Sequence, residues 1–410
     1  MKFFRDLDGA QRLNLSTLFL AGLLFWAGLA SLLPILPLYI QEVGGEQWVG
    51  HVMAFFAVGL LASKAFLAKM TDVRGRKVVL LIGISAIAFT PVGYLLFPNI
   101  PALMGFRAIH GISISAFVTA YSALVIDMSP RQYRGEIIGY MSLVNPLGLA
   151  MGPAIGGFLL ESAGFPPAIL LSAGLGFLGL LCTTRIIESR SQSETKASAS
   201  SSEQSKFWRN LVTPRVRVPA FVLLMVGFAF GTISTFIPLY IAQKSVSLNI
   251  GLFYTASAIM SFSSRLITGR ASDRYGRGVF ITVSVAIYAL ATFTLWHANS
   301  AQGFLLAAAL QGCAAGTVIP MMAALMADRA EAHERGQLFG LCMVGFDVGI
   351  AIAGPTMQTL ALRIGYGNIF GLVTALIVLG LMIFLTCSSK DLAHSIRFAL
   401  GKSRDVYAVD

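Results

Sequence analysis

The stretch Asp72-Val73-Arg74-Gly75-Arg76-Lys77 decides the fold, because a close copy follows later in the chain as Asp273-Arg274-Tyr275-Gly276-Arg277. Each shared residue of the second copy stands 201 positions after its counterpart. The same offset relates Pro37–Ile40 to Pro238–Ile241, Gly111 to Gly312, Asp127 to Asp328, Arg134 to Arg335, Gly135 to Gly336, Gly139 to Gly340 and Gly148 to Gly349. The sequence therefore predicts two related halves of about 200 residues each.

Long apolar segments fill both halves. Hydrophobic residues make up 56% of the chain and charged residues 12%, and the mean hydropathy is +0.75, which excludes a soluble globular protein. A helix needs about 20 apolar residues to cross a bilayer. Because each half contains six such segments, an even number, both halves have the same orientation. We predict an all-α polytopic membrane protein with twelve transmembrane helices in two parallel-related six-helix halves, at 14–40, 48–71, 78–97, 101–127, 135–160, 165–187, 218–242, 249–270, 278–297, 301–327, 336–361 and 366–387.

A polar, serine-rich stretch separates the two groups of segments. We predict an N-terminal half over 1–187, a cytoplasmic linker over 188–217, a C-terminal half over 218–387 and a cytoplasmic tail over 388–410. The linker is too polar to pack, and the tail is a short, basic, amphipathic extension. The apolar stretch 13–40 is too long for the core of a signal peptide, so we expect no cleavage.

Basic residues are distributed unevenly across the predicted membrane. The chain has 30 Lys and Arg against 19 Asp and Glu, a formal net charge of +11. With cytoplasmic termini, 25 of the 30 fall on the cytoplasmic side, Lys64, Arg107 and Arg265 lie within segments, and only Lys244 and Arg363 face outward. The positive-inside rule therefore predicts this orientation and explains the basic clusters without nucleic acid. We expect a monomer in the bacterial inner membrane, with the lipid bilayer as its surroundings.

The two copies of the opening stretch resemble the cytoplasmic G-x3-D-R-x-G-R signature of the major facilitator superfamily. With the twelve segments and the repeat, the resemblance covers 13–387. It implies loops that bias which side of a transporter is open, whereas the alternative is a pair of basic loops with good turn residues. Ala68 and Val73 depart from the signature, which predicts a weaker latch in the first copy. The gating residues under this reading are Asp72, Gly75, Arg76, Asp273, Arg274, Gly276 and Arg277.

The fifth segment carries a glycine pattern similar to the antiporter signature of drug:proton exporters. Three of its glycines are four residues apart, which places them on one helix face and allows close helix packing. Pro153 is expected to bend the helix. The alternative is a generic small-residue packing face. The residues of this antiporter-like helix are Gly139, Gly148, Gly152, Pro153, Gly156 and Gly157.

Ionisable residues within the predicted segments are candidates for proton coupling. Asp347 is the only acidic residue deep inside a segment and is the first choice for the protonatable site. Arg107 and His110 form an R-x2-H-G sequence, similar to the R-x2-Q-G pattern of proton-coupled exporters in the superfamily, and the repeat keeps Gln311 at the position of His110. A static ion pair and a packing histidine are the competing interpretations. Candidate cavity residues are Gln311, Trp26, Tyr121, Tyr140, Phe230 and Phe236.

The chain has no nucleotide-binding loop, catalytic triad or metal-type cysteine spacing, so we predict no enzyme activity, no cofactor and no metal. The resemblance implies a secondary transporter that exports small organic or drug-like compounds in exchange for protons. The alternatives are a proton-coupled importer, or a dedicated exporter of a metabolite, sugar or siderophore. A lipid-moving or sensor membrane protein is the alternative from another class.

Overall fold

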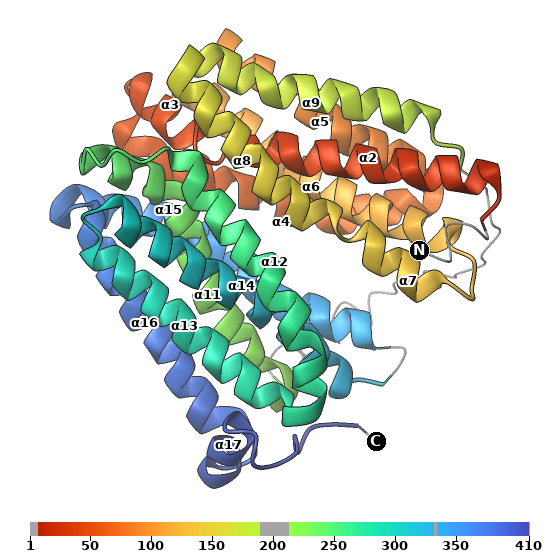
Figure 1. Ribbon diagram of the computed structural model, residues 1–410, viewed down its shortest axis with the longest axis vertical. Coiled ribbons are helices and arrows are strands. Elements are labelled where there is room, and N and C mark those ends of the chain that lie inside the picture. Colours follow the sequence, from red (N-terminus) through yellow and green to blue (C-terminus); the bar gives the residue numbers. More distant parts are fainter. Residues whose placement is uncertain (1–6, 189–212, 332–333, 410) are drawn as a thin grey trace. The chain divides into compact units, whose positions relative to one another are not determined.

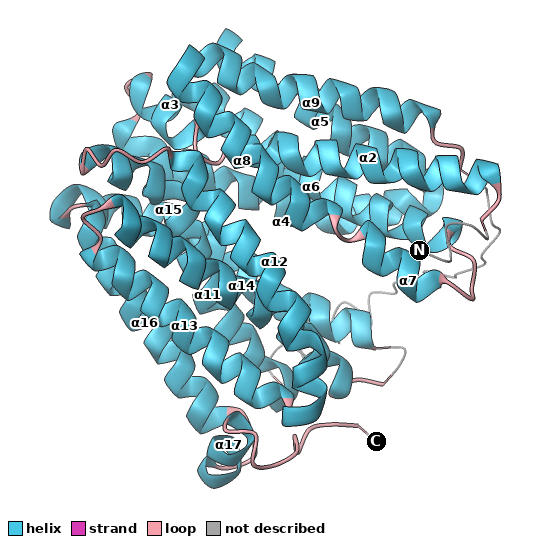
Figure 2. Cartoon of the chain, viewed as in Figure 1, coloured by secondary structure: helices cyan, strands magenta, loops and turns pink. Residues whose placement is uncertain are grey.

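The computed structural model describes residues 7–188, 213–331 and 334–409, except for the side chains of Arg270 and Asp273. Within these ranges the chain consists of helices joined by loops, with no strand (Figure 2). Twelve helical spans are long and apolar enough to cross a membrane. This confirms the predicted all-α fold with twelve transmembrane helices.

The first six spans are built from nine helices, which Figure 1 shows from red to yellow. Their bounds are α2 Gly9–Ser31, α3 Leu36–Glu42, the 3-10 helix η1 Glu46–Trp48, α4 Val49–Arg74, α5 Arg76–Leu96, α6 Ile100–Met128, α7 Arg134–Met141, α8 Val144–Ala163 and α9 Phe165–Arg185.

The last six spans are single helices, and a short helix follows them. Their bounds are α11 Pro214–Gln243, α12 Ile250–Tyr275, α13 Arg277–His297, α14 Ala301–Asp328, α15 Arg335–Ile364, α16 Tyr366–Cys387 and α17 Leu392–Ala399.

The fifth span is interrupted before the glycine-rich helix that contains Pro153. Pro153 lies inside α8, and the break between α7 and α8 falls at Ser142 and Leu143. Pro146 has no N–H to donate to the Ser142 carbonyl one turn earlier, which accounts for a break at this point.

The chain forms two compact units. Unit 1 comprises the described residues within Met1–Ala197 together with Asn249–Thr255, and unit 2 comprises those within Ser198–Leu248 and Ala256–Asp410. Most of the predicted linker, 189–212, lies outside the described residues. The helix α11 begins at Pro214, within the last residues of the predicted linker, where a proline at the first helical position costs no hydrogen bond.

Equivalent turns and caps recur at the 201-residue offset. Gly75 (φ 98°) joins α4 to α5, and Gly276 (φ 89°) joins α12 to α13. A positive φ at these turns favours glycine, which has no Cβ. The Asn99 side chain accepts the Ala102 N–H at the start of α6, and the Ser300 side chain caps α14 in the same way. The repeat therefore encodes local structure as well as hydrophobicity.

Unit 1 packs α2 against α8 and α9, α4 against α6, and α5 against α6 and α9. The rings of Phe25 and Phe117 stack at its centre, with centroids 3.8 Å apart. In unit 2, α11 packs against α15 and α16, and α13 against α14 and α16. Tyr240 lies there between Phe304 and Phe370, at 5.3 and 5.5 Å. Both cores are thus assembled from aromatic side chains on spans far apart in sequence.

Candidate functional site

A buried polar cluster lies on α4, α5 and α6 of unit 1. Arg107 on α6 is only 6% exposed, and its guanidinium carbon lies 4.7 Å from the centre of the Phe56 ring on α4. One turn further along α6, His110 is fully buried, with Nδ1 2.8 Å from the Tyr94 hydroxyl of α5. The Tyr94 side chain also interacts with Arg107. The structure therefore joins Arg107 and His110 through Tyr94, which the sequence pattern did not single out.

Two nitrogen atoms of this cluster have no hydrogen-bond partner among the described residues. They are Nε of Arg107 and Nε2 of His110. A buried polar atom left unpaired costs about 1–3 kcal/mol, and an ionisable residue inside a membrane span is by default a functional candidate. The cluster therefore has hydrogen-bonding capacity available for a solute or a transferred proton.

Unit 2 has a neutral counterpart of the cluster. The Ser257 hydroxyl on α12 donates to Oε1 of Gln311 on α14 at 2.5 Å, and Nε2 of Gln311 donates to the Tyr288 hydroxyl on α13 at 3.4 Å. Gln311 is the repeat mate of His110, so each half joins the same repeat position to a tyrosine on its third span. The mate of Arg107 is Ala308, so the guanidinium is present in the first half alone.

Asp347 lies on α15 and is 8% exposed. Gly345 and Gly349 flank it, and a Cβ at either position would overlap the backbone of α11. The preceding Phe346 packs against Phe230 of α11, with ring centroids 5.8 Å apart. Close packing of α15 on α11 therefore holds the carboxylate in a fixed, largely buried position.

The arginines of the two repeated loops form equivalent ion pairs. Arg76 pairs with Asp127 in unit 1, and Nε of Arg277 lies 3.2 Å from Oδ2 of Asp328 in unit 2. Both carboxylates lie at the end of their half's fourth span, and they stand 201 residues apart. Because Asp127 and Asp328 are separated by the repeat offset of 201 residues, the sequence repeat could have indicated that both belong to the site.

A carboxylate outside the repeated motif contacts the first of the two loops. Asp72 is exposed, and the carboxylate of Glu188 accepts the backbone N–H groups of Arg76 and Lys77 at 2.8 and 3.2 Å. Glu188 thus caps α5, where a negative charge is favourable. The side chain of Asp273 lies outside the described residues, and Arg274 lies over the ring of Tyr275 at 5.5 Å.

The glycines of α8 form a face packed on α2. An added Cβ at Gly148 would overlap Trp26 and Ala27, one at Gly152 would overlap Ala27 and Ser31, and one at Gly156 would overlap Ser31. Gly157 lies on Asn249 and Gly251, which belong to the same unit. Gly139, on α7, has no such neighbour within 4 Å. The close approach of α8 therefore depends on the glycines that follow the break.

The aromatic candidates make packing contacts. The Tyr121 hydroxyl donates to the Met141 carbonyl at 3.0 Å, and Tyr140 stacks on Phe19 at 4.9 Å. Phe236 is fully buried beside Tyr366. Trp26, Tyr140 and Phe230 are half-buried, whereas Tyr121 and Phe236 are buried.

Comparison with known proteins places the chain in a family. A family profile described as Major Facilitator Superfamily matches residues 18–301 and 245–400. The chain belongs to the major facilitator superfamily. The predicted resemblance is thereby confirmed, and the protein is a multi-pass membrane protein of this superfamily.

Superfamily relatives match over most of their length. The multidrug resistance protein MdtG of Enterobacter lignolyticus is 24% identical over 379 residues, which cover 89% of this chain and 90% of that protein. MdtG of Klebsiella pneumoniae is 25% identical over 392 residues, with coverage of 92% and 93%. A crystal structure of a mutant of the nucleoside transporter NupG superposes with a TM-score of 0.78 at 13% identity, covering 90% of this chain and 98% of that one. A POT family transporter superposes with a TM-score of 0.73, also at 13% identity, covering 90% of this chain and 95% of that one.

Proposed function

We propose that this superfamily member exports small, partly hydrophobic organic compounds in exchange for protons by alternating access. The near full-length similarity to multidrug resistance proteins carries the proposal of export. The glycine face of α8 on α2 supports it, because it contains most of the glycine pattern that is similar to the antiporter signature of drug:proton exporters and lets the two helix backbones approach closely. We further propose a monomer in the bacterial inner membrane with both termini in the cytoplasm.

Proton coupling is assigned to the buried ionisable residues. Asp347 would bind and release the transported proton, and the cluster of Arg107, Tyr94 and His110 would bind the solute or relay the proton. The pairs Arg76–Asp127 and Arg277–Asp328 would stabilise one gating state in each half, because charge pairs at moving surfaces have discrete made and broken arrangements. The halves 1–187 and 218–387, the linker 188–217 and the tail 388–410 are the domains we assign.

The test is reconstitution of the purified protein in liposomes with a trapped pH-sensitive dye and an imposed proton gradient. Lipophilic cations, sugars and siderophore-like compounds are added in turn. We expect lipophilic cations to trigger proton movement, and Asp347→Asn to abolish it while Glu161→Gln, which removes an exposed carboxylate from α8, leaves it intact. Proton movement with sugars or siderophore-like compounds alone would contradict drug export, and unimpaired coupling in Asp347→Asn would exclude Asp347 as the proton site.

A further inference from the structure

The short helix α17 lies next to a membrane-spanning surface. The span α16 ends at Cys387, and α17 begins at Leu392, after Asp391 caps it by accepting the His394 N–H at 2.8 Å (Figure 1). Beyond the contact with α17, the helices α13 and α16 expose large apolar side chains, including Leu290, Leu379 and Met382. In a membrane protein such a surface faces lipid, so α17 is placed at the edge of a lipid-facing surface.

One face of α17 is fixed to the ends of α13 and α16. Gly278 leaves room for the backbone of Phe398, whose ring lies 6.1 Å from that of Phe384. The Thr282 hydroxyl donates to the Ala399 carbonyl at 2.9 Å. The helix therefore cannot turn about its axis without losing these contacts.

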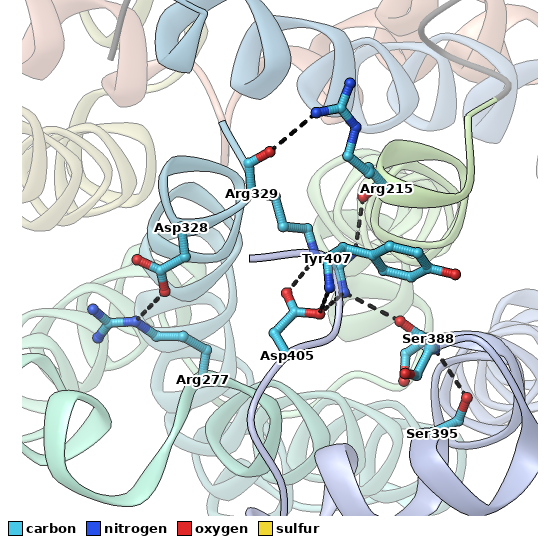
Figure 3. Close-up of polar contacts among 9 residues, drawn as sticks. Arg215, Arg277, Asp328, Arg329, Ser388, Ser395, Asp405 and Tyr407 are labelled. Carbon is cyan, nitrogen blue, oxygen red and sulfur yellow. Dashed lines mark hydrogen bonds and ion pairs between the residues drawn. The ribbon is translucent and has the colours of Figure 1, made fainter. Parts of the chain in front are cut away.

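The chain after α17 is also tied down. Arg329 is fully buried and donates two hydrogen bonds to the carboxylate of Asp405, at 2.5 and 3.0 Å (Figure 3). Its remaining donors reach the carbonyls of Arg215 at 2.7 Å and Ser388 at 3.1 Å, and its guanidinium lies over Tyr407 at 5.1 Å. This clamp joins the tail to the ends of α11, α14 and α16, so both sides of α17 are anchored.

The outward face of α17 is apolar and is bordered by cations. Leu392, Ile396 and Leu400 are 57%, 40% and 48% exposed, and their spacing of four places them along one helical stripe. The exposed basic residues around the stripe are Lys390, Arg397, Lys402 and Arg404, against the single exposed acid Asp391 in the same stretch. An apolar stripe bordered by cations is the pattern of a helix that lies in the interface of an anionic membrane.

We propose that α17 binds anionic lipid, with Leu392, Ile396 and Leu400 in the boundary of the acyl chains and Lys390, Arg397 and Lys402 on phosphate headgroups. The clamp of Arg329 on Asp405 presents the stripe in a fixed direction, so lipid binding needs no reorganisation of the tail. This inference rests on the membrane-spanning fold alone and is independent of what the protein transports.

The test uses the full chain with its four cysteines replaced by alanine and a single Ile396→Cys labelled with an environment-sensitive fluorophore. An Arg131→Cys label on the exposed loop between α6 and α7 is the control. In phosphatidylcholine vesicles with 30% phosphatidylglycerol, we expect brominated acyl chains to quench the label at 396 severalfold more than the label at 131, and aqueous iodide to show the reverse. Equal iodide quenching at both positions would overturn the proposal.

Headgroup recognition is measured separately. Removing phosphatidylglycerol is expected to reduce the lipid quenching at 396, and the triple change Lys390→Gln, Arg397→Gln and Lys402→Gln is expected to remove the difference between the two vesicle types. If the lipid quenching at 396 were the same with and without phosphatidylglycerol, in the protein with the basic residues and in the triple variant alike, the assignment to anionic lipid would be overturned. Hydrogen exchange of the unmodified chain in nanodiscs checks the result without cysteine changes, since phosphatidylglycerol should slow exchange over 392–404 and leave the loop near residue 131 unaffected.

Discussion

The Nδ1 atom of His110 lies 2.8 Å from the hydroxyl oxygen of Tyr94, and this contact joins α6 to α5 beside the guanidinium of Arg107. Tyr94→Phe removes the hydroxyl and leaves the ring in place. Because a typical hydrogen bond contributes about 0.5–1.5 kcal/mol, we expect substrate-driven proton movement to fall severalfold. Tyr275→Phe, at an exposed tyrosine, is the control and should transport normally. Unchanged transport by Tyr94→Phe would remove this contact from the mechanism.

The ion pairs Arg76–Asp127 and Arg277–Asp328 are predicted to control transport more than stability. Pairs that are partly exposed contribute at most about 1 kcal/mol to folding. We expect Arg277→Gln and Asp328→Asn each to slow transport severalfold with little change in melting temperature. The double variant should be no slower than either single one, because one interaction is lost in all three. Multiplied effects in the double variant would mean that the two side chains act separately.

The glycine face of α8 gives a steric prediction. Gly152→Leu places a side chain where the Ala27 carbonyl of α2 lies, so we expect a destabilisation of at least about 1–3 kcal/mol and loss of transport. The matched change Gly139→Leu meets open space and should be tolerated. Thermal unfolding of the detergent-solubilised proteins compares the two, and equal melting temperatures would refute the dependence on close packing.

Removing the ion pair between Arg329 and Asp405 should release the C-terminal tail from the rest of the protein. Asp405→Asn leaves the fully buried Arg329 without its carboxylate, and removal of one partner of a buried pair costs about 3–5 kcal/mol. We expect limited proteolysis to cut the tail of Asp405→Asn at least tenfold faster, whereas Arg404→Gln, at an exposed neighbour, should match the parent protein. Replacing both partners, as Arg329→Met with Asp405→Leu, should restore protection, and a double variant cut as fast as Asp405→Asn would argue against the clamp.

The cap of α17 gives a pH prediction. The backbone N–H of His394, followed by its side chain, lowers the pKa of the Asp391 carboxyl below its ordinary value of 3.8. A lowered pKa means that the cap is fully present above pH 3.8 and is lost as pH falls through the lower folded value. A spin label at Ala393→Cys should thus have the same low mobility at neutral and mildly acidic pH, and its mobility should rise only below about pH 3.8. With Asp391→Ala added, the label should be mobile at every pH. The variant His394→Gln keeps the backbone N–H that the Asp391 carboxylate accepts but removes the imidazole, so it distinguishes the titration of Asp391 from that of His394. If the spin label in this variant became more mobile near neutral pH, the pH dependence would not come from the carboxyl of Asp391.

Much of the fold could be predicted because lipid imposes a simple rule on sequence. A span must be apolar over its whole length, so the twelve helices were evident, and the offset of 201 residues paired them. The break at Ser142 was missed because only Pro153 was considered, whereas the proline that follows the break by one helical turn is Pro146.

The site was less predictable because its partners come from different helices. Arg107 was conspicuous as a charge in an apolar segment, but Tyr94 is one of 11 tyrosines and nothing in its local sequence distinguishes it. Glu188 was missed for a related reason, since it lies at the edge of a polar stretch and contacts α5 more than 100 residues earlier in the chain.

The two ion pairs allow the features of this protein to be ordered in time. A chain that arose by duplication of a half-length gene inherits every shared feature from its precursor, including Gly75 and Gly276 as well as both arginine–aspartate pairs. Differences between the copies came later, and the change that separates Arg107 from Ala308 is one of them. The precursor therefore already possessed the paired loops, whereas the two copies have since diverged at the position of Arg107.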